Sequence, residues 1–242
     1  MNGQQERTAS GIMRWMRSPA FVRILPFALF MVFLAISSML PPPEPAPVGA
    51  LDSRWPYAAR TLAVGVVLAM LWRRFGELHA SPRMNLSEWM LAIASGAAVF
   101  VVWIHLDSGW AVFGDSSERG FDPRVHGSES LHIPLTVLRL LGLAVVVPIA
   151  EELFWRSFLL RWVQQQHFLA LAPRDIGARA ILVSSVLFAL EHSQWLAGLF
   201  AGLVYAWIYQ RTGKLWVSIV SHGVTNAMLG GWILITRDWR FW

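Results

Sequence analysis

Long apolar runs separated by short polar segments dominate the chain, which is the pattern of a protein that crosses a membrane several times. The first run, Ile24–Leu40, follows a polar segment that carries arginines, and an alternative interpretation is a signal peptide. The proline-rich residues that follow favour an uncleaved first span. Six further apolar runs lie at Ala58–Trp72, Trp89–Ile104, Pro134–Ala150, Ala178–Glu191, Trp195–Tyr209 and Leu215–Ile235. We therefore predict an all-α fold, a polytopic transmembrane helix bundle of about seven to eight helices.

The run Pro134–Ala150 does not end at Ala150, because helical character continues through two adjacent carboxylates, Glu151 and Glu152, to about residue 163. Pro148 cannot donate a hydrogen bond to the preceding turn of the helix. We therefore expect either one helix of roughly 30 residues with a kink, or two helices broken near Pro148. The second case gives the bundle its eighth helix.

The carboxylate pair needs neutralisation. An ionised side chain within a bilayer costs at least a few kcal/mol, and two adjacent carboxylates repel each other. Glu152 and Arg156 are four residues apart, so a helix places them on one face at a spacing that suits an ion pair. Arg156 lies roughly 140° around the helix from Glu151. The helical phase therefore predicts that Arg156 neutralises Glu152 and that Glu151 points elsewhere.

Composition supports a membrane protein and removes several kinds of chemistry. Hydrophobic residues make up 55% of the 242 residues and charged residues only 14%, against about 25% in average soluble domains. The chain has no cysteine, which excludes disulfides, a thiol nucleophile and a cysteine-ligated metal. The net charge of +5 is compatible with nucleic-acid binding, but membrane topology explains it better, and we predict no nucleic-acid partner.

The basic residues are distributed unevenly between the two ends of the predicted spans. With the N-terminus inside, thirteen of the twenty lysines and arginines lie inside and six, including Arg60, lie outside. This positive-inside bias predicts a cytoplasmic N-terminus, and we expect an integral protein of the bacterial inner (plasma) membrane. The proline-rich segment 41–56 is expected to form a stiff external connection. The polar segment His105–Ile133 is expected to form an external loop.

Ionisable side chains within the predicted spans are few, and such residues usually face the bundle interior and mark function. Phe188 with His192, and His222 with Asn226, each repeat a four-residue spacing on one helical face. Together with Glu151, three helices can bring a carboxylate, two imidazoles and an amide to one buried point. A carboxylate with a histidine can take a proton from water, and a second histidine with an asparagine can stabilise an oxyanion. The set is sufficient for peptide hydrolysis.

Each of these residues alone also has a structural explanation. An intramembrane histidine, or Asn226, can serve as a hydrogen bond between helices. Glu191 is interpreted as a residue that faces a loop at a helix end, and Arg139 receives no catalytic role. The functional interpretation therefore depends on the combination rather than on any single residue.

Three motifs occur in order on three predicted spans, namely Glu151-Glu152-x-x-x-Arg156, Phe188-x-x-x-His192 and His222-x-x-x-Asn226. In this combination, over about residues 134–236, the chain resembles the CAAX-protease and bacteriocin-processing family of intramembrane glutamic endopeptidases. The surroundings of the first motif also resemble the bacterial subgroup associated with exosortase and PEP-CTERM systems.

The resemblance implies that Glu151 and His192 activate water and that His222 and Asn226 hold the oxyanion. It implies no cofactor and no metal, and a membrane-associated protein or peptide as the substrate in the lipid bilayer. The supporting residues that it implies are Glu152, Arg156 and Phe188.

These predictions divide the chain into four parts: a cytoplasmic N-terminal segment (1–20), N-terminal membrane helices with the external loop (21–133), a catalytic membrane core (134–236) and a C-terminal tail (237–242). Two other functions stay open. Glu151, His192 and His222 are also zinc-ligand types, so a zinc-dependent membrane protease is one, although no His-Glu-x-x-His helix occurs. The other is a non-catalytic transporter, immunity factor or assembly scaffold, because proton-coupled transporters also bury Glu and His.

Overall fold

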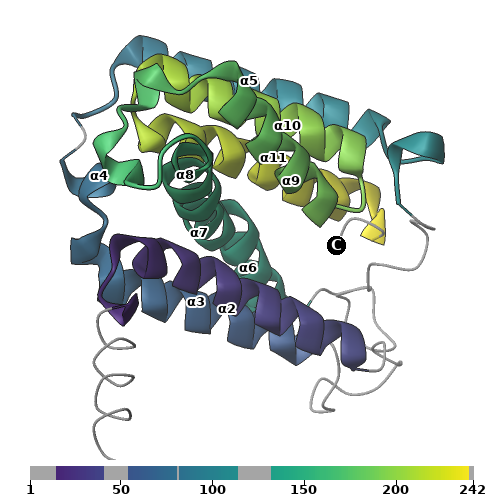
Figure 1. Ribbon diagram of the computed structural model, residues 1–242. Coiled ribbons are helices and arrows are strands. Elements are labelled where there is room, and N and C mark those ends of the chain that lie inside the picture. The colour runs from purple at the N-terminus through teal and green to yellow at the C-terminus, as the bar shows by residue number, and fades with distance from the viewer. Residues whose placement is uncertain (1–14, 41–53, 81, 114–131, 240–242) are drawn as a thin grey trace, which may run out of the picture.

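The computed structural model describes residues 15–40, 54–80, 82–113 and 132–239. Every regular element among them is helical, which confirms the predicted all-α helix bundle (Figure 1). Most of the proline-rich connection and most of the predicted external loop lie outside the described residues.

The helices follow the predicted apolar runs closely. Two π-helical segments, η4 (Gly142–Val146) and η5 (Leu153–Leu159), join α6, α7 and α8 into one continuous helix. Short 3₁₀ turns lie at Trp72–Arg74, Gly109–Ala111, Phe168–Ala170 and Pro173–Asp175. The α-helices are α2 (Pro19–Met39), α3 (Arg54–Leu71), α4 (Gly76–His79), α5 (Leu86–His105), α6 (Ile133–Leu141), α7 (Val147–Glu152), α8 (Leu160–Gln164), α9 (Ala178–Glu191), α10 (Trp195–Thr212) and α11 (Leu215–Thr236).

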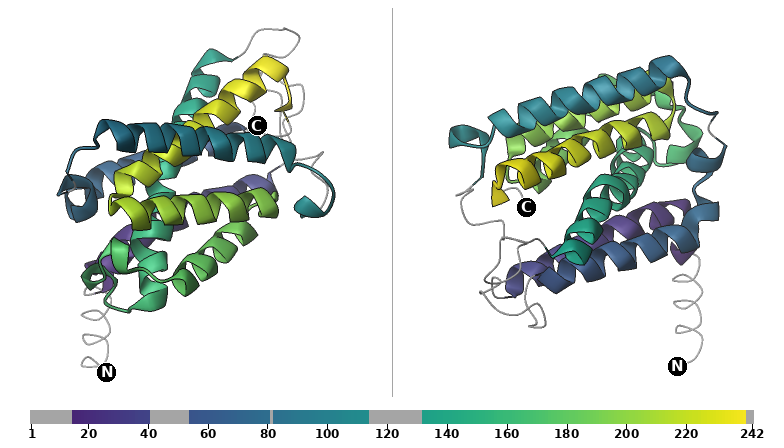
Figure 2. Two further views of the ribbon diagram at one scale, coloured as in Figure 1. Left: turned by 90° about the horizontal axis from the view of Figure 1, so that it is seen from above. Right: turned by 180° about the vertical axis from the view of Figure 1, so that it is seen from behind.

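The bundle has two groups of helices with the long α6–α8 helix crossing between them (Figures 1 and 2). α2 and α3 pack against each other on one side, and α5, α9, α10 and α11 pack together on the other. The long helix contacts α2 and α3 with one face and α9 and α11 with another. A polar side chain on the long helix can therefore lie at the junction of both groups, away from lipid.

The long helix is continuous at Pro148, so of the two expected arrangements the single helix is present. The π-helical segment η4 directly precedes the proline, and this wider turn accommodates a residue that cannot donate to the helical ladder. Two carbonyls of η4 lie close to α11. Asn226 Nδ2 donates to the carbonyl of Leu143 at 2.9 Å. A Cβ on Gly223 would lie 2.8 Å from the carbonyl oxygen of Ala144, so only glycine permits this approach.

Several helices have the dimensions and surface of membrane spans. Four of them are long and apolar enough to cross a membrane, namely Pro19–Met39, Leu86–His105, Ile133–Gln164 and Leu215–Thr236. Large apolar side chains also cover the outside of the shorter α3, where Leu62, Val66 and Met70 are 58%, 56% and 78% exposed. A water-soluble fold of this size would bury such residues, whereas lipid accepts them. The chain is an integral membrane protein.

The helix α9 is too short to cross a membrane. Its 14 residues rise about 21 Å, which is less than the roughly 30 Å hydrocarbon thickness of a bilayer. A helix that starts at one surface with the exposed Arg179 therefore ends inside the hydrophobic layer. His192 follows directly after that end.

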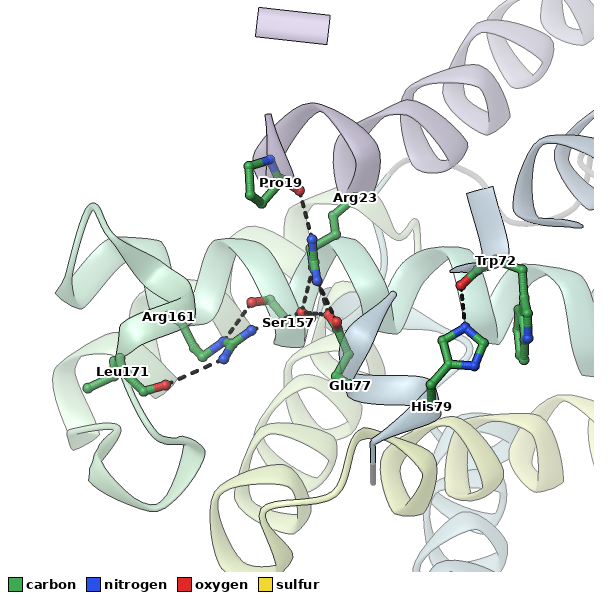
Figure 3. A network of polar contacts seen from close by, with 8 residues as sticks. All are labelled: Pro19, Arg23, Trp72, Glu77, His79, Ser157, Arg161 and Leu171. Atoms are coloured by element: carbon green, nitrogen blue, oxygen red, sulfur yellow. Dashed lines mark hydrogen bonds and ion pairs between the residues drawn. The ribbon is translucent and has the colours of Figure 1, made fainter. Parts of the chain in front are cut away.

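A buried polar network ties α2 and α4 to the long helix (Figure 3). Arg23 forms an ion pair with Glu77 and donates to Ser157 Oγ at 3.1 Å, and Ser157 also donates to Glu77. Burial alone would raise the pKa of the Glu77 carboxyl, but the hydrogen bonds and charge of Arg23, with Ser157, outweigh it and hold the pKa below the usual value.

This network predicts an acid-sensitive contribution to stability. Because the folded-state pKa of Glu77 is lowered, the stabilisation is present above the unfolded-state pKa and is lost as pH falls through the folded-state pKa. We expect Glu77→Gln to lower the free energy of unfolding by roughly 1–3 kcal/mol at neutral pH. The difference in melting temperature between wild type and Glu77→Gln, measured in detergent, should shrink as the pH is lowered below about 4.5. A difference that is constant with pH would contradict an ionised Glu77.

Topology gives a second prediction. The charge bias of the sequence predicts that the N-terminus and residues near Arg83 lie inside, and that the segment 120–128, which is outside the described residues, lies outside the membrane. Reporter fusions after Arg83 and within 120–128 should therefore report opposite sides of the membrane. Fusions that report the same side would show that the span assignment is wrong.

Candidate active site

The residues singled out by the sequence meet at one cavity of about 320 Å³ at the junction of the two helix groups. Glu151 reaches it from the long helix, His192 from the end of α9, and His222 and Asn226 from α11. The predicted convergence of a carboxylate, two imidazoles and an amide is therefore present in the structure.

Glu151 is buried at the wall of this cavity. Its side chain is 5% exposed, and its Oε2 has no hydrogen-bond partner among the described residues. The nearest ionisable nitrogen is Nε2 of His222, at 4.0 Å, which is too long for a direct hydrogen bond. A buried carboxylate without a partner is costly, so this atom at the cavity wall makes Glu151 a candidate functional residue.

Glu152 is fully buried and lies between two cationic or potentially cationic groups. Its Oε2 lies 3.2 Å from Nε of Arg156, so the ion pair predicted by the four-residue spacing is present. Its Oε1 lies 3.0 Å from Nδ1 of His222. The carboxylate thus connects Arg156 on the long helix to His222 on α11 and orients the His222 ring.

His192 does not lie on α9 as predicted, but directly after it. Its backbone is extended, with φ −103° and ψ 137°, because the chain turns there towards α10. Gln194 stabilises this turn by donating to the carbonyl of Trp103 at 3.0 Å. The ring of His192 nevertheless stays beside Phe188, with centroids 4.6 Å apart, and Nδ1 lies 2.8 Å from the carbonyl of Phe188. A carbonyl only accepts hydrogen bonds, so Nδ1 carries the proton and Nε2 of a neutral ring is free to accept.

Aromatic rings hold these polar groups in place. Phe188 is buried between Arg156, whose guanidinium carbon lies 4.5 Å from its ring centroid, and the two histidine rings. Tyr205 stacks on His222 with centroids 4.9 Å apart and donates to Thr225 at 2.7 Å. The sequence analysis includes Phe188 and omits Tyr205, because Tyr205 belongs to none of the three motifs.

Sequence reasoning also missed a cationic wall of the cavity. Arg60 and Tyr57 from α3 and Arg139 from α6 line the side opposite α11. The guanidinium carbons of both arginines lie over the Tyr57 ring, 4.4 and 4.2 Å from its centroid. The sequence analysis treats Arg60 only as a charge at the outside end of a span. A lone arginine within the apolar run of α3 is the signal that could have found it.

Metal ligands were an open possibility in the sequence. Within the part of the chain that the structure describes, no three His, Cys, Asp or Glu side chains are grouped so that they could hold a metal ion.

Glu191, interpreted from the sequence as a residue facing a loop, instead accepts a hydrogen bond from Trp155 Nε1 at 3.2 Å.

The fold and the cavity define a membrane-embedded helix bundle with a buried polar site. Residues 133–228, about two-fifths of the chain, match the family described as Type II CAAX prenyl endopeptidase Rce1-like. The match confirms the resemblance to the CAAX-protease family. The matched segment contains all three motifs, and the family supports a hydrolase of the protease type. No curated protein and no solved structure matches the chain.

Proposed function

We propose that the protein is an intramembrane endopeptidase that hydrolyses a peptide bond with a water molecule activated by Glu151 and His192. The observation that carries the proposal is the buried Glu151 carboxylate, which faces the cavity without a hydrogen-bond partner among the described residues, beside two histidines. A water bound there would lose a proton to the carboxylate while its oxygen attacks the substrate carbonyl carbon.

The tautomer of the neutral His192 ring, with its hydrogen on Nδ1, supports a role as a base. The Nδ1–H group of His192 donates to the carbonyl of Phe188. Nε2 is therefore the ring nitrogen whose lone pair can accept a hydrogen bond from a water molecule in the cavity. His192 can therefore hold the attacking water together with Glu151. The proton taken from water then passes to the departing amine when the tetrahedral intermediate collapses and the carbon–nitrogen bond breaks.

His222 and Asn226 suit the stabilisation of the oxyanion. His222 Nδ1 lies 3.0 Å from Oε1 of Glu152, so Nε2 is the ring nitrogen left to donate to the oxyanion, which it does when the ring carries both protons. Asn226 uses one N–H for the carbonyl of Leu143, and its second N–H remains for the negatively charged oxygen. In this proposal Glu152, Arg156 and Phe188 position these groups, and residues 134–236 form the catalytic core.

The substrate in this proposal is a membrane-associated protein or peptide, and the membrane is the bacterial inner membrane with the N-terminus in the cytoplasm. A prenylated C-terminus is not transferred from the family description to this chain. We propose to identify the substrate by comparing the membrane-fraction peptides of cells that express the wild type or Glu151→Ala. Fragments that accumulate only with the wild type identify the cleavage site.

Chelation separates this mechanism from the zinc-dependent alternative. If Glu151 and His192 activate water directly, purified protein should keep its proteolytic activity in a strong chelator and should contain no stoichiometric zinc. A zinc-dependent enzyme would lose activity in the chelator and recover it with added Zn²⁺, because the metal would lower the pKa of the attacking water. Metal content by elemental analysis and activity on the identified peptide are the two measurements. Recovery with Zn²⁺ would overturn the glutamic mechanism.

A further inference from the structure

A second cavity lies at the end of the bundle where α2 begins and α3 ends. It has a volume of about 500 Å³ and lies between the first turn of α2, α4, and the segment that follows α8. Three arginines, Arg23, Arg74 and Arg161, line it together with one carboxylate, Glu77. None of these residues belongs to the three motifs or to the proposed reaction.

Among the residues that the structure describes, the side chains that line this cavity carry more positive than negative charge. Glu77 is engaged by Arg23 and by Ser157 (Figure 3). Arg161 is 5% exposed, and its hydrogen bonds to described residues all reach neutral oxygens: Ser157 O at 2.7 Å, Ser157 Oγ at 3.1 Å and Leu171 O at 3.4 Å. The exposed Arg74 donates to another neutral oxygen, the carbonyl of Arg17. Three guanidinium groups thus line the cavity with one carboxylate, Glu77, which is already paired with Arg23. The buried charge of Arg161 has no counter-charge among the described residues, and such a charge is costly.

The position of the cavity places it at the surface of the membrane. Pro19 is the first residue of the first apolar span, and Gly76 follows the end of α3. Exposed apolar side chains occur at the cavity and just before α2: Leu169 lines the cavity and is 48% exposed, and Trp15 and Met16, which precede α2, are 55% and 49% exposed. Tryptophan at the end of a span is typical of the interface between headgroups and acyl chains.

We propose that this cavity binds the phosphate group of an anionic phospholipid. Guanidinium groups suit phosphate because their N–H groups are arranged to donate in pairs to its oxygens, and the phosphate would supply the counter-charge that Arg161 and Arg74 lack among the described residues. Basic pockets between membrane helices hold anionic headgroups in this way. The acyl chains would leave along the exposed apolar surface at Leu169. The proposal is independent of the proposed peptidase function.

The test is lipid binding to the purified full-length protein in a neutral detergent, counted by native mass spectrometry. The probes are phosphatidylglycerol, phosphatidylcholine with the same short acyl chains, and inorganic phosphate. We expect the wild type to bind one phosphatidylglycerol at least about tenfold more tightly than phosphatidylcholine, whose ammonium group the arginines repel. Arg74→Gln should weaken phosphatidylglycerol binding roughly fivefold, and Arg161→Gln roughly tenfold or more, because the latter is buried.

The matched control is Arg73→Gln, which removes an equally exposed arginine from the same short turn but from outside the cavity. It should leave the phosphatidylglycerol affinity unchanged within about twofold. Equal weakening by Arg73→Gln and Arg74→Gln would overturn the site, because binding would then reflect general surface charge. Equal affinity for both lipids would also overturn it. Inorganic phosphate that displaces the lipid at similar concentration would overturn the lipid as the ligand. Arg74→Gln keeps the test decisive if Arg161→Gln fails to fold.

Discussion

Glu151→Gln is expected to lower the rate of peptide-bond cleavage by roughly 10²–10⁴, the contribution typical of a general base. Glutamine has nearly the shape of glutamate, but its amide cannot accept a proton from water at neutral pH. Glu151 Oε2 has no hydrogen-bond partner among the described residues, so the substitution breaks no described hydrogen bond of that atom. The measurement is the turnover of the identified peptide by purified protein, together with its melting temperature.

The matched control for this experiment is Glu191→Gln, which neutralises another largely buried carboxylate near the cavity. Glu191 accepts a hydrogen bond from Trp155 and does not line the cavity. We expect Glu191→Gln to keep turnover within about one order of magnitude of the wild type. If Glu151→Gln keeps wild-type turnover at an unchanged melting temperature, another group is the base.

Arg156→Ala is expected to destabilise the fold by roughly 3–5 kcal/mol, because it leaves Glu152 as a buried carboxylate with only His222 beside it. The arginine also fills the space between the rings of Phe188 and Tyr205, so its removal opens a cavity in the interior. The expected result is poor accumulation in the membrane and a lower melting temperature.

A double variant shows whether the loss comes from the unpaired carboxylate. Glu152→Gln combined with Arg156→Ala removes the charge that Arg156→Ala leaves behind, so it should recover part of the lost stability. Arg179→Ala, at an exposed position on α9, is the control and should change stability by less than about 0.5 kcal/mol. A well-folded Arg156→Ala protein that loses only turnover would instead make Arg156 part of the reaction.

Local spacing made part of the site predictable from the sequence. Glu152 and Arg156 lie on the same helical stretch, so their four-residue separation alone determines that they face each other. The approximate positions of the helices were also accessible, because the apolar runs are long. α9 has the bounds of the extended run and α11 ends one residue later than predicted, whereas α2 begins five residues and α3 four residues before the predicted runs.

The rest of the site depends on contacts between segments that are distant in the sequence. Arg60 lines the cavity only because α3 packs on the long helix, and no local pattern specifies that contact. His192 lies beyond its helix because Gln194 bonds to backbone carbonyls at the end of α5. The contact between His222 and Glu152 joins two helices whose relative rotation the sequence pattern leaves open.

The six-residue α7 lies between two π-helical segments, so this part of the long helix should be sensitive to insertions and deletions in the gene. Removing or adding one residue between Gly142 and Leu159 would turn part of the long helix by about 100° relative to the rest. The carboxylate pair would then face away from α11. Natural variants should therefore keep the length of this stretch constant. An alignment of related genes should show gaps on either side of the stretch and none within it.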